Sequence, residues 1–243
     1  MIGQRFSHLP DVVKNLMIIN GLFFLATWSL KSKGIDLSSW LALHQFQSPK
    51  FMPHQLITHM FMHANFTHLF FNMFTLWMFG KTLENVWGGK RFLTYYVITG
   101  LGAALIYIAY IQLQISNISS NLNSELYKIV LNEGHKVLQN FQNYTDTDMG
   151  QLNSLINTPM VGASGAVYGL LLAFGMLFPN TLLYLYMAIP VKAKYFVGGI
   201  GILALISGIS NNPGDNVAHF AHLGGMIIGL ILLKYWKKNG DIY

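Results

Sequence analysis

Ser164 is the residue whose surroundings best suit a nucleophile. It stands between glycines in TPMVGASGAVY, residues 158–168, within an apolar run that continues to Phe178. Flanking glycines remove side-chain bulk, so a neighbouring helix or an extended peptide can approach the hydroxyl closely. A packing seam of small residues would show the same pattern. Ser164 therefore indicates chemistry only if residues elsewhere in the chain support it.

A histidine near the C-terminal end of the sequence is suited to activate this serine. At neutral pH an unassisted serine hydroxyl is a weak nucleophile and needs a base. His222 lies in VAHFAHLGGMIIGLILL, and Gly225 and Gly229 follow it on the same helix face, which would bring the imidazole against another helix. A structural histidine lining a cleft is the alternative. Asp215 lies about two turns away, too far along a straight helix to orient the ring, so the sequence predicts a Ser–His dyad.

Two polar residues of another apolar segment supply hydrogen-bond donors. His68 and Asn72 are four positions apart in FMHANFTHLFFNMFTLWMFG and therefore share a helix face. Inside a membrane such groups are unfavourable unless they meet polar partners or water; simple interhelical hydrogen bonding is the alternative to a functional role. The Asn72 amide, a His68 ring N–H and the Ser164 backbone N–H suit the oxyanion of acyl transfer. Tyr168, one turn after Ser164, is expected to pack on the His222 imidazole.

The composition is that of a membrane protein. Of 243 residues, 53% are hydrophobic and 10% charged, with a mean hydropathy of +0.41, whereas soluble domains carry roughly 25% charged residues. Most of the apolar stretches approach the roughly 20 residues that span a hydrocarbon core; they cover about 12–30, 63–79, 92–113, 159–178, 195–210 and 216–236. The sequence predicts an all-α polytopic membrane protein, one six-transmembrane-helix bundle over residues 1–243, with a long polar insertion at 114–158 between helices three and four.

The basic residues indicate orientation rather than nucleic-acid binding. The net charge of +6 comes from residues scattered at segment ends. With the N-terminus in the cytoplasm, the inner side carries ten of them: Arg5, Lys14, Lys81, Lys90, Arg91, Lys192, Lys194, Lys234, Lys237 and Lys238. The outer side keeps five: Lys31, Lys33, Lys50, Lys128 and Lys136. The positive-inside bias then predicts a multi-pass protein of the cell or inner membrane, with both termini cytoplasmic, a retained first segment and no nucleic-acid partner.

This topology places the polar groups at one depth. The second, fourth and sixth helices all begin at the outer surface. Counted from the predicted helix starts at about 1.5 Å per residue, Ser164 and His68 lie about 8 Å down, His222 about 10 Å and Asn72 about 14 Å. Polar groups that packed independently would have no reason to share a layer. Hydrolysis also needs water at this depth, so His63, His68 and His219 are expected to line a wet cavity open to the outer face.

The connecting segments carry weaker signals. Residues 31–62 suit a structure lying in the outer interface, or an ordinary loop with aromatic anchors. The turn FGKTLENVWGGKRF should reverse the chain at the inner face, with Glu84 and Arg91 as possible partners across it. The segment 195–210 carries no ionisable side chain and is expected to be lipid-facing or mobile. In the insertion, apolar residues at near-helical spacing predict an amphipathic surface helix: Leu122, Leu126, Ile129, Val130, Leu138 and Phe141.

Three motifs taken together resemble those of the rhomboid family of intramembrane serine proteases: GASGAVYG at 162–169, AHLGG at 221–225, and the pair His68 and Asn72. The resemblance covers nearly the whole chain, residues 17–236. It implies a six-helix fold that cuts single-span transmembrane substrates without a cofactor or metal. Its implied site has Ser164 as nucleophile, His222 as base, an oxyanion site made by His68, Asn72 and the Ser164 backbone, and Tyr168 stacked on the imidazole.

The sequence departs from the family pattern in two places. Where the family often carries a Trp-Arg pair before the second helix, this chain has Pro53, His54 and Gln55, which leaves the anchoring of that loop unassigned. The insertion at 114–158 is unlike the compact members and also has no assigned role.

Two other readings compete with a serine protease. Histidines gather near two helix starts, which would suit a metal site, but no HExxH motif is present and no membrane-embedded acidic residue accompanies them. The second alternative is a catalytically inactive rhomboid-like protein that only binds membrane helices. Retention of both Ser164 and His222 argues against it. The sequence does not predict an oligomeric state.

Overall fold

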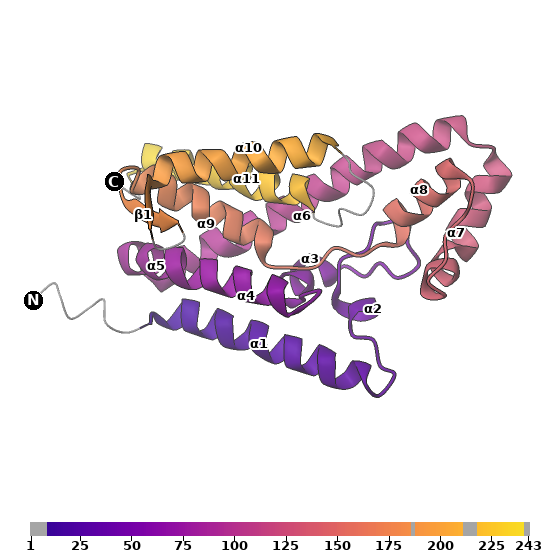
Figure 1. The fold of residues 1–243 in the computed structure, drawn as a ribbon, viewed down its shortest axis with the longest axis horizontal. Coiled ribbons are helices and arrows are strands. Elements are labelled where there is room, and N and C mark those ends of the chain that lie inside the picture. Colours follow the sequence, from indigo (N-terminus) through magenta and orange to yellow (C-terminus); the bar gives the residue numbers. More distant parts are fainter. Residues whose placement is uncertain (1–8, 186–187, 211–217, 241–243) are drawn as a thin grey trace, which may run out of the picture.

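A computed structural model describes residues 9–185, 188–210 and 218–240 (Figure 1). The segments 1–8 and 211–217, with the predicted positions of Arg5 and Asp215, lie outside the described residues. The helices are α1 (Asp11–Lys31), α2 (Ser38–Leu41), α3 (Gln55–Thr58), the 3-10 helix η1 (His59–Phe61), α4 (Phe66–Thr75), the π-helical η2 (Leu76–Gly80), α5 (Lys81–Trp87), α6 (Gly89–Asn121), α7 (Ser124–Gln139), α8 (Thr147–Asn157), α9 (Ser164–Leu177), α10 (Ala193–Ser210) and α11 (His219–Lys238); the strands are β1 (Leu182–Leu185) and β2 (Ile189–Lys192).

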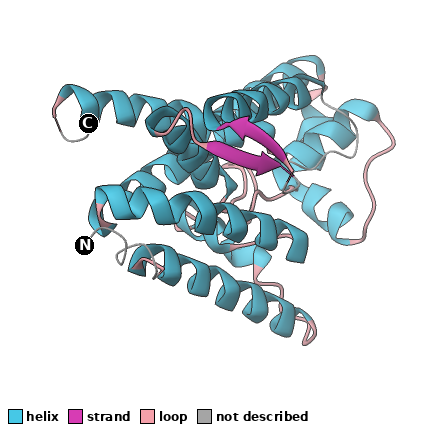
Figure 2. Cartoon of the chain, turned by 60° about the vertical axis from the view of Figure 1, so that its left-hand side comes forward, coloured by secondary structure: helices cyan, strands magenta, loops and turns pink. Residues whose placement is uncertain are grey.

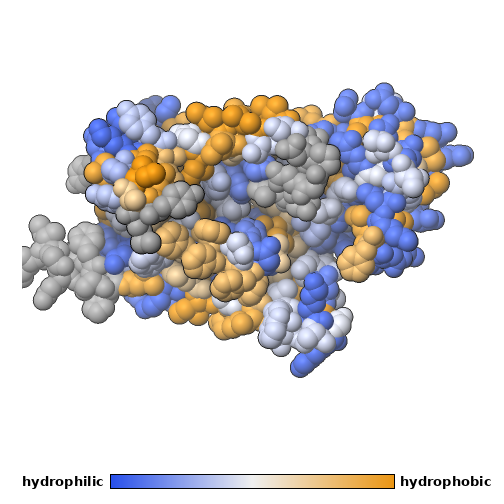
Figure 3. Space-filling model, viewed as in Figure 1, coloured by the Kyte–Doolittle hydropathy of each residue, from blue (hydrophilic) through white to orange (hydrophobic). Residues whose placement is uncertain are grey.

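Helices α6, α9 and α11 pack on one another at the centre of a helical bundle, and α1, α4 and α10 lie around them. The buried core joins residues of all these layers, among them Val13, Phe79, Tyr95, Leu170, Val197 and Leu233. Within the described residues, three helices are long and apolar enough to cross a membrane: α1, α6 and α10; α9 is a shorter apolar helix. Apolar side chains cover much of the bundle surface, as they must where lipid replaces water (Figure 3). The all-α polytopic membrane fold predicted from the sequence is confirmed.

The second apolar segment begins later and ends later than expected. Its helix starts at Phe66 rather than at 63, because the side chain of Asn65 accepts a hydrogen bond from the His68 backbone N–H at 2.8 Å and caps the first turn. From there α4, η2 and α5 follow one another without a break to Trp87. The chain reverses at Gly88, whose φ of 78° is unfavourable for a residue with a side chain.

The prediction that Glu84 faces Arg91 across this turn is wrong. The Glu84 carboxylate instead accepts hydrogen bonds from the backbone N–H groups of Val12 and Val13, at 2.9 and 2.8 Å. These amides belong to the first turn of α1, where they have no partner within the helix, and a negative charge is favourable there. Arg91 lies over the ring of Trp236, 5.7 Å from its centroid. Glu84 therefore attaches α1 to the bundle.

The fourth apolar segment is helical only from Ser164 onward, not from about 159 as predicted. Leu43 and Met160 form an isolated antiparallel bridge, with N–H to O distances of 2.9 and 2.8 Å. The Gly162 N–H donates to the His59 carbonyl at 2.9 Å. These pairings keep the residues before Ser164 out of the helix, so Ser164 is the first residue of α9.

Helix α6 runs to Asn121, past the predicted end at 113, and the insertion folds against its extension. At about 1.5 Å per residue its 33 residues measure about 50 Å, which exceeds a hydrocarbon core of about 30 Å. Its end from Ile111, with α7 and α8, encloses a second core: Ile111, Ile115, Ile118, Val130, Met149, Leu152 and Ile156. We call residues 111–157 the outer subdomain; polar side chains gather over it at the right of Figure 3.

The amphipathic helix predicted in the insertion is α7, but two residues of its apolar pattern, Leu122 and Phe141, lie outside it. Val130 is fully buried in the second core. Phe141 lies beyond the end of the helix, at a φ of 58°, and is fully exposed. Because Phe141 is apolar, it fits the helical spacing of the sequence although the helix ends before it.

At the opposite end of the bundle, β1 and β2 form an antiparallel hairpin that joins α9 to α10 (Figure 2). Leu182 pairs with Lys192 and Leu185 with Ile189. The Ala193 N–H donates to the Thr181 carbonyl at 2.9 Å, which fixes the start of α10 beside the end of α9. This hairpin was not expected from the sequence.

Candidate active site

The Ser164 hydroxyl and the His222 imidazole are in hydrogen-bonding contact. Ser164 Oγ lies 2.9 Å from His222 Nε2, and His222 is 8% exposed. Ser164 comes from the first turn of α9 and His222 from the first turn of α11. A base at this distance is placed to accept the hydroxyl proton as the oxygen attacks.

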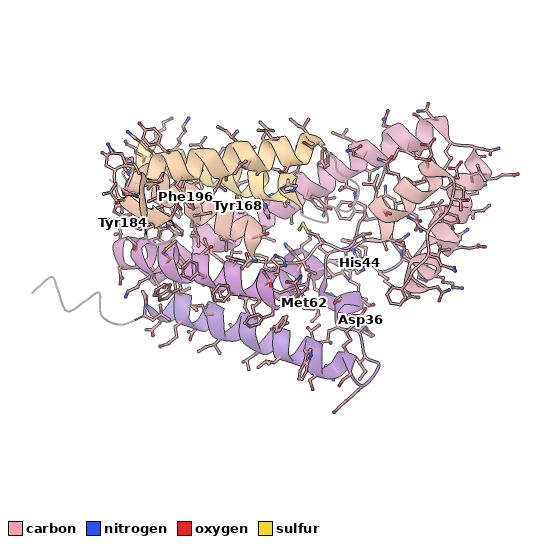
Figure 4. The ribbon with its side chains drawn as sticks, viewed as in Figure 1. Asp36, His44, Met62, Tyr168, Tyr184 and Phe196 are labelled. Atoms are coloured by element: carbon pink, nitrogen blue, oxygen red, sulfur yellow. The ribbon has the colours of Figure 1, made fainter. Side chains whose placement is uncertain are left out.

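Tyr168 packs flat against the same imidazole. The two ring centroids are 4.1 Å apart and the ring planes differ by 11°. Tyr168 is one turn from Ser164 on α9, so one helix carries both the hydroxyl and the ring that contacts its partner. Figure 4 shows Tyr168 inside the bundle. The stacking limits how far the imidazole can rotate away from Ser164.

Glycines bring α9 and α11 close enough for this contact. A Cβ on Gly225 would overlap the carbonyl oxygen of Gly165, and a Cβ on Gly229 would overlap the Tyr95 hydroxyl. A Cβ on Gly165 would lie 2.5 Å from the Ala103 Cβ of α6. The small-residue face that the sequence predicted beside His222 therefore packs backbone against backbone, as small residues permit in membrane helices.

The two predicted oxyanion donors line the same cavity as the dyad. His68 is directed at Gly162, where an added Cβ would lie 2.8 Å from His68 Nε2 and 3.7 Å from Ser164 Oγ. Gly162 has a φ of 122°, so both the backbone angle and the space require glycine. Asn72 is 5% exposed, and its amide donates one hydrogen bond to the His68 carbonyl at 2.9 Å. The amide's second N–H is available for another acceptor.

The start of α9 adds backbone donors. Because Ala163 is the residue before the helix and its carbonyl accepts from the Val167 N–H, the N–H groups of the first turn have no partner within the helix. Such a helix start favours negative charge. The sequence named the Ser164 backbone N–H as a donor but not its place at the start of a helix, because the predicted helix began five residues earlier.

One cavity of about 1830 Å³ holds these groups. His63 and His68 are among its lining residues, with their rings 5.1 Å apart, and His63 is 5% exposed. His219 is not among them; its ring lies edge-on to His222 at a centroid distance of 6.0 Å. His63 and His68 thus line the cavity as predicted, and the same role for His219 stays a prediction.

Gln55 anchors the segment before α4, at the place where the sequence departs from the family pattern. It is fully buried, donates to the carbonyls of Trp40 and Lys50 at 3.3 and 2.8 Å, and accepts from the His44 N–H at 3.2 Å. Its own carbonyl lies 2.9 Å from His59 Nδ1, and burial lowers the pKa of His59 to about 4, so this imidazole is neutral. A single amide thereby holds three points of the loop.

No three His, Asp or Glu side chains converge on a possible metal position within the described residues. His59, His63 and His68 all line the cavity, and His59 Nδ1 also contacts the Gln55 carbonyl.

The bundle and its cavity define a class of protein: a polytopic membrane protein with a Ser–His pair in a cavity of mixed polar and apolar lining between its helices. Comparison with known proteins agrees. The rhomboid domain matches residues 50–238, and the chain belongs to the rhomboid family.

Curated relatives are similar over most of the chain. RHOMBOID-like protein 12, mitochondrial, of Arabidopsis thaliana is 28% identical over 94% of this chain and 59% of its own length. Rhomboid protein 1, mitochondrial, of Saccharomyces cerevisiae is 25% identical over 96% of the chain and 55% of its length. Rhomboid protease AarA of Providencia stuartii is 28% identical over 71% of the chain and 52% of its length. The chain thus spans little more than half the length of these relatives.

Proposed function

We propose that this chain is an intramembrane serine endopeptidase that hydrolyses peptide bonds of transmembrane proteins by a Ser164–His222 dyad. The observation that carries the proposal is the 2.9 Å contact between Ser164 Oγ and His222 Nε2 inside a cavity of a rhomboid-family bundle. Family membership and relatives named as proteases support the reaction class.

In the proposed mechanism Ser164 Oγ attacks the carbonyl carbon of the scissile bond while His222 Nε2 accepts the hydroxyl proton. The oxyanion accepts hydrogen bonds from the Ser164 backbone N–H, the free N–H of the Asn72 amide and a His68 ring N–H. His222 then gives its proton to the leaving amine, and an acyl-enzyme remains. A water molecule, deprotonated by His222, attacks the ester, and return of the proton to Ser164 Oγ releases the acid. Tyr168 keeps the imidazole facing Ser164 throughout.

We propose that substrates are single-span membrane proteins that enter between α4 and α10. Phe71 of α4 and Ile200 of α10 both line the cavity that holds the dyad. Helix α10 is the more lightly packed of the two sides, with only Ala193, Val197 and Ala204 buried along its length. No cofactor or metal has a part in this mechanism.

The decisive experiment combines cleavage with active-site labelling. In reconstituted full-length protein, Ser164→Ala should abolish both cleavage of a reporter membrane helix and labelling by a fluorophosphonate probe, because the nucleophile is gone. His222→Ala should abolish labelling of Ser164. Ser120→Ala, an exposed serine on the α6 extension, and His135→Ala in α7 are matched controls that should retain both signals. Undiminished cleavage by Ser164→Ala would refute the serine mechanism.

The same experiment separates a protease from a catalytically inactive rhomboid-like protein that only binds membrane helices. Such a protein would retain the reporter helix on pull-down, yet neither cleave it nor react with the probe. The direct contact between Ser164 and His222 favours the protease.

We propose one domain over residues 1–243, in the cell or inner membrane, with both termini cytoplasmic and the outer subdomain on the opposite side. The shared core of α1, α6, α9 and α11 supports a single unit, and the basic residues support the orientation. Because the chain has no cysteine, Gln139→Cys and Lys238→Cys can each be probed alone. An impermeant maleimide added to intact cells should label position 139 and spare 238; the reverse pattern would invert the topology.

A further inference from the structure

The outer subdomain supplies a wall of the cavity that contains the dyad. Ser164 and His222 share that cavity with residues of the subdomain: Asn143, Thr147, Gly150, Gln151, Ser154 and Leu155. Because α6 is about 20 Å longer than a hydrocarbon core, the subdomain at its end lies outside the apolar layer. The cavity therefore continues from the dyad out of the membrane along α8.

The residues of α8 that line the cavity form one face of the helix. Thr147, Gln151 and Ser154 follow one another at spacings of four and three, and Leu155 lies beside them. The opposite face, with Met149, Leu152 and Ile156, is buried in the second core. We call Thr147, Gln151, Ser154 and Leu155 the α8 stripe.

The α8 stripe offers uncharged hydrogen-bonding groups to whatever lies in the cavity. Thr147 and Gln151 are exposed, and their side chains make no hydrogen bond to other described residues. The charged residues beside them, Asp146 and Asp148, are not among the cavity-lining residues. A face of hydroxyl and amide groups with one leucine suits an extended polypeptide, whose backbone carries both donors and acceptors.

A chain of side-chain hydrogen bonds, two of them buried, holds α8 in this position. Asn153 donates to Asn143 at 3.0 Å, Asn157 donates to Asn153 at 2.9 Å, and Ser48 donates to Asn157 at 3.2 Å. Ser48 belongs to the loop that Gln55 anchors, so the stripe is fixed to the same loop as the bridge preceding Ser164. These bonds therefore fix the position of α8 relative to Ser164 and His222.

We propose that the α8 stripe binds the extramembrane segment of the substrate next to the cleaved bond, and so selects substrates by an uncharged polar flank. This inference rests on the proposed protease function. From Ser154 the chain reaches Ser164 through the last turn of α8 and the six residues 158–163, a distance of at most about 30 Å. A substrate flank of about nine extended residues spans that distance. A lipid headgroup is a poorer occupant, because the stripe carries no basic side chain to pair with a phosphate.

Kinetics test the selection. Thr147→Ala combined with Gln151→Ala should raise KM about tenfold for a single-span reporter that keeps its extramembrane flank, since two hydrogen bonds are lost, with kcat unchanged. A reporter truncated at the membrane boundary should be cleaved equally by variant and wild type. The matched control is Asn132→Ala with Gln139→Ala, two exposed uncharged residues of α7 outside the cavity. An unchanged KM, or the same rise for both reporters, would overturn the inference.

Cross-linking tests binding without catalysis. In full-length Ser164→Ala protein in liposomes, Gln151→p-benzoylphenylalanine should cross-link to the reporter's flank, while the same substitution at Gln139 should not. The substitution at Phe71, within the cavity beside the bundle helices, reports on binding of the membrane helix itself. Cross-linking at position 71 but not at 151, or cross-linking at 151 to lipid alone, would refute binding of the flank by the α8 stripe. The proposed protease function would be unaffected. Absence of cross-linking at both positions, with no labelling of wild-type Ser164, overturns the proposed function itself.

Discussion

The seam between α9 and α11 and the helix α10 are both rich in glycine, but they use it in opposite ways. In the seam, a Cβ on Gly225 would overlap the Gly165 carbonyl oxygen, and one on Gly229 would lie 3.4 Å from the Gly169 Cα. On α10, Gly198 and Gly199 have nothing within 4 Å of the position a Cβ would take. Glycine in the seam permits backbone contact, whereas on α10 it leaves one side of the helix bare.

This difference concerns how firmly the seam between α9 and α11, on one hand, and α10, on the other, are packed in the bundle. Van der Waals packing is the main attraction between membrane helices, because lipid is as apolar as the side chains. The seam has that packing at backbone distance, and it carries Ser164 and Tyr168 on one side and His222 on the other. Helix α10 meets α11 through side chains, such as that of Met226 against Gly201. Ser164 and His222 are thus held at an interface packed at backbone distance, beside a helix that packs on α11 through side chains.

The largest effect should come from a methyl group inside the seam. Gly225→Ala places its Cβ on the Gly165 carbonyl oxygen, and neither backbone can yield without separating the helices. We expect a loss of about 3 kcal/mol in the free energy of unfolding and loss of Ser164 labelling by a fluorophosphonate. Unfolding in SDS, followed by circular dichroism, measures the change in the free energy of unfolding. A Gly225→Ala protein as stable as wild type would show that α9 and α11 are not packed at backbone distance there.

A smaller effect should come from removing one hydroxyl at the edge of the seam. The Tyr95 hydroxyl of α6 donates to the Gly169 carbonyl of α9 at 3.0 Å, in a fully buried position. Tyr95→Phe keeps the ring and leaves that carbonyl without this donor, so unfolding should be easier by about 1 kcal/mol. The same SDS titration measures it, with Tyr235→Phe, an exposed tyrosine of α11, as control. Equal shifts in the two variants would contradict a specific role for the bond.

The smallest loss of stability, none at all, should come from α10. Gly198→Ala with Gly199→Ala adds two methyl groups where there is open space and replaces the residue least favourable in a helix apart from proline. The free energy of unfolding should stay level or rise by up to about 1 kcal/mol per site. A loss of stability comparable to that of Gly225→Ala would remove the contrast between the two regions.

The residues proposed to carry the chemistry could be chosen from the sequence because polar side chains are conspicuous in apolar segments. Ser164, His222, His68, Asn72 and Tyr168 were all named, and the structure brings all five to one cavity. Helix ends were predicted less well. The apolar pattern continues through residues 159–163 and through Phe141, but neither stretch is helical. Hydropathy reports where a segment can be buried and does not report where its backbone leaves the helix.

Contacts between distant segments could not be predicted at all. Glu84 was paired with a basic residue nearby in the sequence, and it binds backbone amides of α1 instead. Gln55 gave no signal as an anchor, because a buried amide and an exposed one look alike in a sequence. The insertion had no assigned role until the fold placed α8 beside the cavity.

The sequence by itself determined that this is a polytopic helical membrane protein and which polar side chains stand in its apolar segments, since both follow from local composition and period. Only the tertiary structure decided that Ser164 begins its helix, that the Leu43–Met160 bridge holds the chain before it, and that the outer subdomain forms a wall of the cavity. These features depend on hydrogen bonds and steric fit between segments far apart in the chain, and such pairings leave no mark on the pattern of either segment alone.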